Sequence, residues 1–94
     1  MNNSKIFDEE LYGLFDGTIA GIALLDLFRD FRGVHTENIN GIDFVIEKDR
    51  AGITLHTGNT PIDVTPYGFT CRGKGDICVN LRGAVEKCQK WNLI

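Results

Sequence analysis

The sequence predicts one α+β domain over residues 1–94, made of a long N-terminal helix, an antiparallel meander of four to five strands and a C-terminal helix. Apolar residues recur with the period of a helix up to Phe31 and with the two-residue period of a strand from Ile42. The length supports one hydrophobic core and is too short for two. Because a meander of this size has one face to bury, we expect both helices to cover the same apolar face and the other face to be polar.

The N-terminal helix is expected to begin after a cap at Asp8 and to run to Phe31, with Gly33 as its stop. A break near Asp16-Gly17 is the alternative, because Asp16 is also a good cap. The helix is apolar on two sides. One side faces the sheet, and the second consists of glycines at every fourth position and the apolar residues that continue them, Gly13, Gly17, Gly21, Leu24, Phe28 and Phe31.

This second side predicts a partner, because a surface helix normally has a single apolar stripe. Its glycines let another backbone approach closely, either that of the C-terminal helix or that of a second subunit. The C-terminal helix offers a stripe of only about three turns, which is too short to cover residues 13–31. We therefore expect these residues to form an interaction surface, in a homodimer or with a host protein.

The most specific hairpin signal is Gly58-Asn59, which is typical of a two-residue type II′ turn. A turn at this position pairs Leu55 with Ile62 and Ile53 with Val64. All four apolar side chains then lie on one face of the sheet, which supports this register.

The last hairpin is expected to join Phe69–Arg72 to Ile77–Val79 through a three-residue loop in which Gly75 is left-handed. This loop keeps the apolar residues of both strands on one face and places Cys71 inside. A loop of two or four residues is the alternative, and it would place Cys71 opposite Cys78.

The final helix is predicted from Asn80, which is a good cap, and from the apolar stripe that follows it. The residues of this stripe are Leu81, Ala84, Val85, Cys88 and Trp91.

The three cysteines, Cys71, Cys78 and Cys88, predict free thiols in a reduced cytoplasmic protein, because their number is odd and no signal peptide pattern precedes them. Their spacing lacks the paired knuckle of a zinc site, so we expect neither a metal nor another cofactor.

The charge pattern makes a nucleic-acid partner improbable, because the net charge is −3 and phosphate binding needs an excess of Lys and Arg. The balance is −6 over residues 1–49 and +3 over residues 50–94. In the simpler interpretation, folding brings residues of the two halves next to one another, so that no charged patch remains. The alternative is a bipolar surface that favours head-to-tail contacts or an acidic partner.

The polar face of the predicted sheet carries the residues that could contact a ligand or partner, His56, Asp43, Asp63, Arg72 and Lys74. A histidine beside a carboxylate can serve acid–base chemistry, so an enzyme that uses His56 with Asp43 or Asp63 is one alternative. Ordinary solvated charges on an exposed sheet show the same pattern, and we favour that interpretation.

Residues 13–15, Gly-Leu-Phe, followed by residues 19–21, Ile-Ala-Gly, resemble a fragment of a viral fusion peptide. This resemblance would imply a membrane-active segment. A glycine-rich apolar helix that packs inside a protein has the same composition, so we expect packing and no membrane partner.

These observations favour a non-enzymatic, self-associating protein-interaction module. Short chains without a known motif are often accessory or inhibitor proteins of phages and other mobile elements, which adds that role as an expectation. A small-molecule-binding domain is a further alternative, with a pocket between helices and sheet near Tyr12, Phe44, Tyr67 and Trp91.

Overall fold

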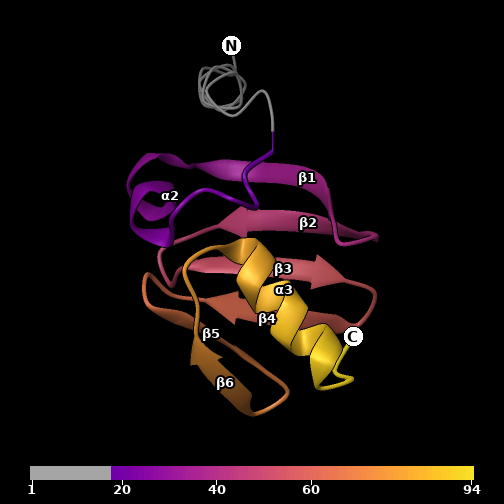
Figure 1. Cartoon of the computed structure of the whole chain (residues 1–94). Coiled ribbons are helices and arrows are strands. Elements are labelled where there is room, and N and C mark those ends of the chain that lie inside the picture. The colour runs from indigo at the N-terminus through magenta and orange to yellow at the C-terminus, as the bar shows by residue number, and fades with distance from the viewer. Residues whose placement is uncertain (1–17) are drawn as a thin grey trace.

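The chain folds as an α+β protein in which two helices pack on a six-stranded antiparallel sheet (Figure 1). This computed structural model describes residues 18–94. The strands pair strictly in sequence order, so the sheet is a meander. The elements are α2 (Leu24–Asp30), β1 (Gly33–Ile39), β2 (Ile42–Lys48), β3 (Ile53–Thr57), β4 (Thr60–Val64), β5 (Gly68–Cys71), β6 (Lys74–Ile77) and α3 (Leu81–Lys90).

The predicted long helix is wrong over residues 18–23 and is confirmed over residues 24–30. Residues 18–23, which we call the N-terminal turn, are not helical, and α2 begins only at Leu24. The backbone N–H groups of Ile19 and Ala20 donate to the two carboxylate oxygens of Glu37 on β1, at 2.8 and 2.9 Å. These long-range bonds replace the helical ones. The expected cap at Asp8 and the possible break at Asp16-Gly17 lie outside the described residues.

One strand, β1, lies where no strand was predicted, so the sheet has six strands instead of four to five; β6 covers residues 74–77 and not the expected residues 77–79. The prediction missed β1 because its alternate positions are nearly all polar, as in His35 and Glu37, so they give no apolar period. The turn between β1 and β2 is Asn40-Gly41, with φ of +52° and +88°. Positive φ at both positions is the geometry of a type I′ hairpin, for which Asn-Gly is the preferred pair.

The hairpin predicted around Gly58-Asn59 is confirmed. Leu55 pairs with Ile62 and Ile53 pairs with Val64. Gly58 has a φ of +53° and Asn59 is not left-handed, which fits a type II′ turn.

The predicted register of the last hairpin is wrong. The loop is the two-residue turn Arg72-Gly73, so that Cys71 pairs with Lys74 and Thr70 with Gly75. Arg72 itself is left-handed, with a φ of +52°, although the prediction reserved that conformation for a glycine. The last strand consequently ends at Ile77.

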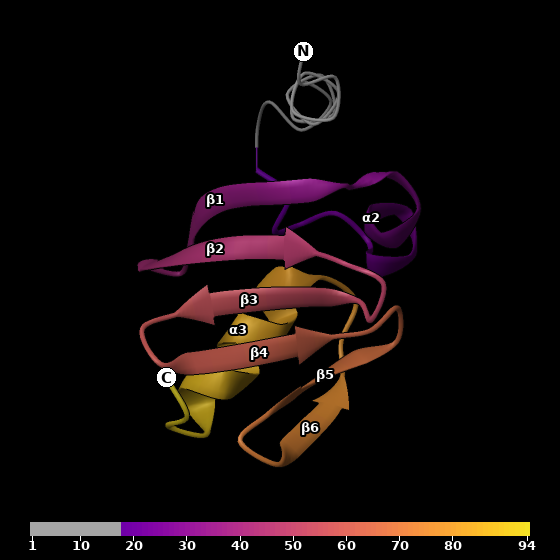
Figure 2. The same cartoon turned by 180° about the vertical axis from the view of Figure 1, so that it is seen from behind.

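The core lies between the helices and one face of the sheet. Asn80 caps α3 through a 2.9 Å bond from the Gly83 N–H to its side-chain oxygen, as predicted. Figure 1 shows α3 crossing in front of β3 and β4, and in Figure 2 neither α2 nor α3 covers the opposite face of these strands. Both helices contribute to one cluster of buried residues: Ile19, Ala20, Leu24, Leu27, Phe31, Ile39, Phe44, Ile46, Ile53, Leu55, Ile62, Val64, Phe69, Cys71, Leu81, Ala84, Val85 and Cys88.

Within residues 18–94, neither helix has the length and apolar character needed to cross a membrane.

Candidate protein-interaction groove

The predicted interaction residues do not share one exposed face. Leu24 and Phe31 are buried in the core, and Phe28 is half-buried with the Lys48 ammonium 5.9 Å from its ring centroid. Gly21 is exposed within the N-terminal turn. The two remaining residues, Gly13 and Gly17, lie outside the described residues. An interface through these six residues therefore stays a prediction.

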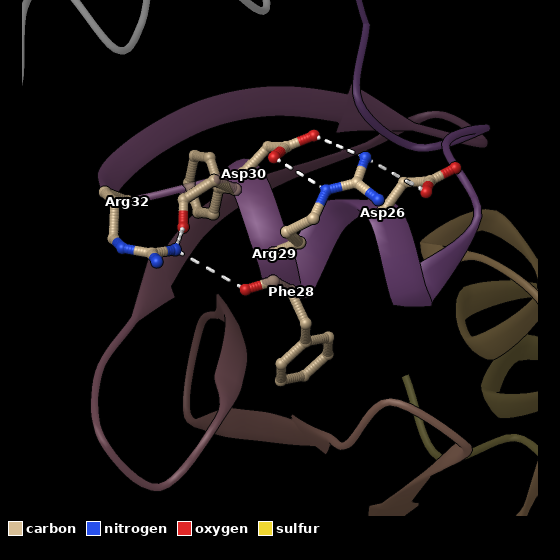
Figure 3. Close-up of polar contacts among 6 residues, drawn as sticks. Asp26, Phe28, Arg29, Asp30 and Arg32 are labelled. Atoms are coloured by element: carbon tan, nitrogen blue, oxygen red, sulfur yellow. Dashed lines mark hydrogen bonds and ion pairs between the residues drawn. The ribbon is translucent and has the colours of Figure 1, made fainter.

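The outer side of α2 is charged, as Figure 3 shows. Arg29 makes two hydrogen bonds to Asp30, at 3.0 and 2.9 Å, and an ion pair with Asp26 at 3.2 Å. These contacts raise the pKa of Arg29 and lower the pKa of Asp30, chiefly through their mutual hydrogen bond. The guanidinium of Arg32 donates to the backbone carbonyls of Phe31 and Phe28 (Figure 3). This surface is solvated and does not offer an apolar stripe to a partner.

Exposed apolar side chains gather elsewhere, around a groove of about 680 Å³. Leu25 is 64% exposed, Tyr67 75%, Ile77 73% and Val79 73%. The groove is lined by the start of α2, the turn between β4 and β5, the segment that joins β6 to α3, and one side of α3; its residues are Ala23, Leu24, Leu25, Pro66, Tyr67, Ile77, Cys78, Val79, Asn80, Gly83, Glu86 and Lys87.

Backbone hydrogen bonds hold the walls of the groove together. The N–H of Leu24 donates to the carbonyl of Val79 at 2.8 Å, which fixes the start of α2 against the β6–α3 segment. The N–H of Cys78 donates to the carbonyl of Tyr67 at 3.3 Å, which fixes the same segment against the β4–β5 turn. The segments that carry the exposed side chains are therefore hydrogen-bonded to one another and form one rigid base.

The β4–β5 turn is set by Thr65, whose hydroxyl oxygen accepts from the N–H groups of Tyr67 and Gly68 at 3.3 and 3.2 Å. Gly68 is needed for the close approach of the next strand, because a Cβ at this position would collide with the carbonyl oxygen of Asp76. This local geometry presents the ring of Tyr67 to solvent at the rim.

A charged pair borders the groove on the α3 side. The Lys87 ammonium lies 2.6 Å from a carboxylate oxygen of Asp76 and 3.2 Å from the carbonyl of Ile77. The hydrogen bond from Lys87, followed by the bond from the Ile77 N–H, lowers the pKa of Asp76. Partial burial raises the pKa of the Cys78 thiol, which lines the groove. At neutral pH the groove therefore has an apolar interior, a neutral thiol and a charged border.

Sequence reasoning missed a second cluster, which anchors the N-terminal turn. Glu37 holds the backbone of Ile19 and Ala20, and its Oε1 lies 3.1 Å from Nε2 of His35. The side chain of Glu37 is only 6% exposed. No signal in the sequence pointed to this cluster, because it depends on β1 and on a turn where a helix was expected.

The alternative of an enzyme would combine His56 with Asp43 or Asp63, and the structure describes other polar contacts for His56 and Asp43. The described ion pair of His56 is with Glu47, at 3.3 Å, and both side chains are about half exposed. Asp43 accepts a 2.9 Å hydrogen bond from the side-chain amide of Asn38. Asp63 on β4 lies opposite Thr54 of β3 and Thr70 of β5. Arg72 donates to the Thr60 hydroxyl at 2.8 Å, and Lys74 is exposed at the start of β6. Whether any of them contacts a ligand stays a prediction.

The aromatic residues of the predicted small-molecule pocket are also spread out. Phe44 is buried in the core, and Trp91 packs against Phe69 with ring centroids 5.8 Å apart. Only Tyr67 lines the groove, and Tyr12 lies outside the described residues.

The three cysteines are free thiols. Burial, reinforced by the neighbouring Cys71, raises the pKa of Cys88 to about 12. In the part of the chain that the structure describes, no three His, Cys, Asp or Glu side chains are grouped to hold a metal ion.

No family model matches the chain, and no curated protein or solved structure shows a significant match to it.

Proposed function

We propose that the chain is a non-enzymatic protein-interaction module that self-associates through the groove. The observation that carries this proposal is that Leu25, Tyr67, Ile77 and Val79 surround one hollow, each at least 64% exposed. Single exposed apolar residues are ordinary on a protein surface, whereas a contiguous patch is typical of a binding site.

The energetics favour a covered state for this patch. Each of the four side chains retains roughly two-thirds of its accessible surface, so covering it stabilises a complex by about 1–2 kcal/mol. The rigid base described above adds to this, because little backbone freedom is lost when a partner binds. A protein partner also suits the charged border, since interfaces commonly have an apolar centre and a polar rim.

Light scattering on the full chain tests the proposal. We expect a mass above the monomer value of 10.5 kDa at micromolar concentration. The double variant Ile77→Ser, Val79→Ser should shift the chain to monomer, because it removes apolar surface from two walls of the groove. The matched control is Val45→Ser, which removes an exposed valine of β2 that does not line the groove.

A strictly monomeric parent chain would contradict self-association. If the groove variant associates as strongly as the control, the interface lies elsewhere on the molecule. Urea midpoints of the three proteins show whether each variant is folded, and we expect the changes to be small because the substituted side chains are exposed.

Other functions have less support. The groove volume lies in the range of small-molecule sites, but its four most prominent side chains project into solvent instead of closing over a cavity. The half-exposed pair of His56 and Glu47 has the character of a surface ion pair.

Free thiols at all three cysteines favour a reducing compartment, so we propose a cytoplasmic protein. A role as an accessory or inhibitor protein of a mobile element, with a host protein as partner, is retained as a proposal.

A further inference from the structure

We propose that Cys71 and Cys88 are an oxidation site, at which a peroxide joins the two buried thiols in a disulfide that ties α3 to β5. Two observations support it: rows of core residues on these two elements face each other, and Cys88 lies in the last turn of α3. The pair requires neither the groove nor a second copy of the chain, so the oxidation site is independent of the proposed function.

The two thiols meet where α3 packs on β5. Phe69 and Cys71 are two residues apart on β5, so their side chains lie on the same face of the sheet, and both are buried. Cys88 and Trp91 are three residues apart at the end of α3, so they lie on the same side of the helix. The rings of Phe69 and Trp91 pack with centroids 5.8 Å apart, which brings the row that contains Cys88 over the row that contains Cys71.

The thiols of Cys71 and Cys88 are also direct neighbours. After burial, the interactions that raise the pKa of Cys88 come chiefly from Cys71, and they include a side-chain hydrogen bond between the two residues. A disulfide needs the two sulfur atoms to approach to about 2.05 Å. The side chains therefore have to rotate as the bond forms, while the helix and the strand that carry them already face each other.

Cys78 does not fit either thiol of this pair. Its N–H donates to the carbonyl of Tyr67, four residues before Cys71, which corresponds to about 13 Å along an extended chain. On the helix side, a Cβ added to Gly83 would lie 3.6 Å from the Cβ of Cys78, and Cys88 is five residues, about 7.5 Å, further along the axis. Both separations exceed the distance of about 4 Å between Cβ atoms that a disulfide allows.

The reaction consumes one molecule of hydrogen peroxide for each pair of thiols. The thiolate of one cysteine attacks a peroxide oxygen, the O–O bond breaks, and a sulfenic acid and one molecule of water are formed. The thiolate of the other cysteine then attacks the sulfenic sulfur, so that the S–S bond forms, the S–O bond breaks and a second molecule of water leaves. The two thiols together lose two electrons and two protons, which the peroxide takes up. A dithiol reverses the reaction by thiol–disulfide exchange.

Local opening of the end of α3 controls the rate of this reaction. Cys88 lies in the last turn of the helix, which ends at Lys90. Helix ends open at a lower free-energy cost than the whole domain, so the oxidation does not require global unfolding. Because little of Cys88 is thiolate at neutral pH, the pair should respond slowly, to sustained exposure to peroxide.

Oxidation of the full chain by hydrogen peroxide in native buffer tests the proposal. The remaining thiols are alkylated, the chain is digested, and mass spectrometry identifies the linked peptides. We expect a linkage between Cys71 and Cys88 within one chain, which a dithiol reverses. Because the bond closes a loop of about 17 residues, the oxidised chain should have a thermal denaturation midpoint at least about 5 °C above that of the reduced chain.

Two variants separate the pair from the third thiol. Cys78→Ser keeps both members of the pair and should form the linkage at the parent rate. Cys71→Ala removes one member, so it should show no linkage within the chain and no reversible rise of the midpoint. A urea midpoint measured before oxidation shows whether Cys71→Ala is folded. If it is not, Cys78→Ser decides alone, because the pair is then formed by the only two cysteines in the chain.

Three results would overturn the proposal. The first is a linkage in the parent chain that joins Cys78 to either of the other cysteines. The second is a linkage in Cys78→Ser that forms only in a denaturing concentration of urea, and the third is a midpoint that falls on oxidation. A monomeric reduced chain would remove the proposed function and leave the oxidation site standing.

Discussion

Glu37 places a carboxylate, 6% exposed, on the core side of β1, where its two oxygens accept from the N–H groups of Ile19 and Ala20. An ionised carboxylate in such a place is stabilised only if hydrogen-bond donors replace the lost water. The two backbone donors do this, at 2.8 and 2.9 Å. The side chain of Glu37 thereby fixes the position of residues 18–23. The periodicity of apolar residues in this part of the sequence could not reveal such a contact.

Substituting Glu37 should therefore loosen the N-terminal turn. In Glu37→Gln, one carboxylate oxygen becomes an NH₂ group that faces a backbone donor. We expect a loss of about 1–3 kcal/mol in the free energy of unfolding, measured by urea denaturation. Hydrogen exchange at Ile19 and Ala20 should accelerate. The matched control is Glu47→Gln, whose ion pair with His56 is half exposed and should be worth less than about 1 kcal/mol. Equal losses in the two variants would contradict this role.

The hairpins show which elements the sequence could predict. The β3–β4 pairing was predicted correctly because Gly58-Asn59 and the two-residue apolar period agreed. The Asn40-Gly41 turn had an equally clear signal, but the residues before it lack an apolar two-residue period, so β1 was not predicted. The Arg72-Gly73 turn had no clear signal, because an arginine at φ +52° is an uncommon choice that residue preferences do not favour.

Gly41 should matter for its conformation alone. Its φ is +88°, and nothing lies within 4 Å of the position that a Cβ would occupy. Gly41→Ala should therefore lower the free energy of unfolding by about 1–2 kcal/mol through backbone strain at the β1–β2 turn. The comparison is Gly21→Ala, where φ is ordinary and only the tip of Arg82 lies near, at 3.2 Å. Thermal denaturation of both variants measures the difference, and a neutral Gly41→Ala would show that the turn adopts another geometry.

At the scale of the whole molecule, the sequence predicted the class but not the candidate site. The α+β class, the antiparallel pairing and the capped α3 follow from local patterns. The groove combines residues 23–25, 66–67 and 77–87, three stretches that are distant in sequence, and its outline depends on where α2 begins. Ile77 was expected inside the sheet; the two-residue loop pairs it with Gly68 instead and leaves it exposed. A register three residues away from the expected one thus concealed the candidate groove.

The core and the groove should differ in thiol reactivity. Cys71 and Cys88 are buried, whereas Cys78 is half-buried in the groove. At mildly alkaline pH we expect an alkylating reagent to modify Cys78 first, as mass spectrometry of digested samples would show. Because the pKa of Cys88 is raised to about 12, its thiolate forms only at higher pH, so its modification should stay slow until the core opens. A low concentration of urea should accelerate the alkylation of Cys88 selectively. Equal alkylation rates for all three thiols in native buffer would contradict a closed core.

The meander also has a kinetic consequence. Every ladder of the sheet joins strands that are adjacent in sequence, through turns of a few residues. Little loop-closure entropy is lost as each strand adds to the one before it, so low contact order favours rapid folding of the sheet. The contacts of high sequence separation, such as Glu37 with Ile19 and Arg82 with Ala20, are then expected to form late, after the surface on which they close is complete.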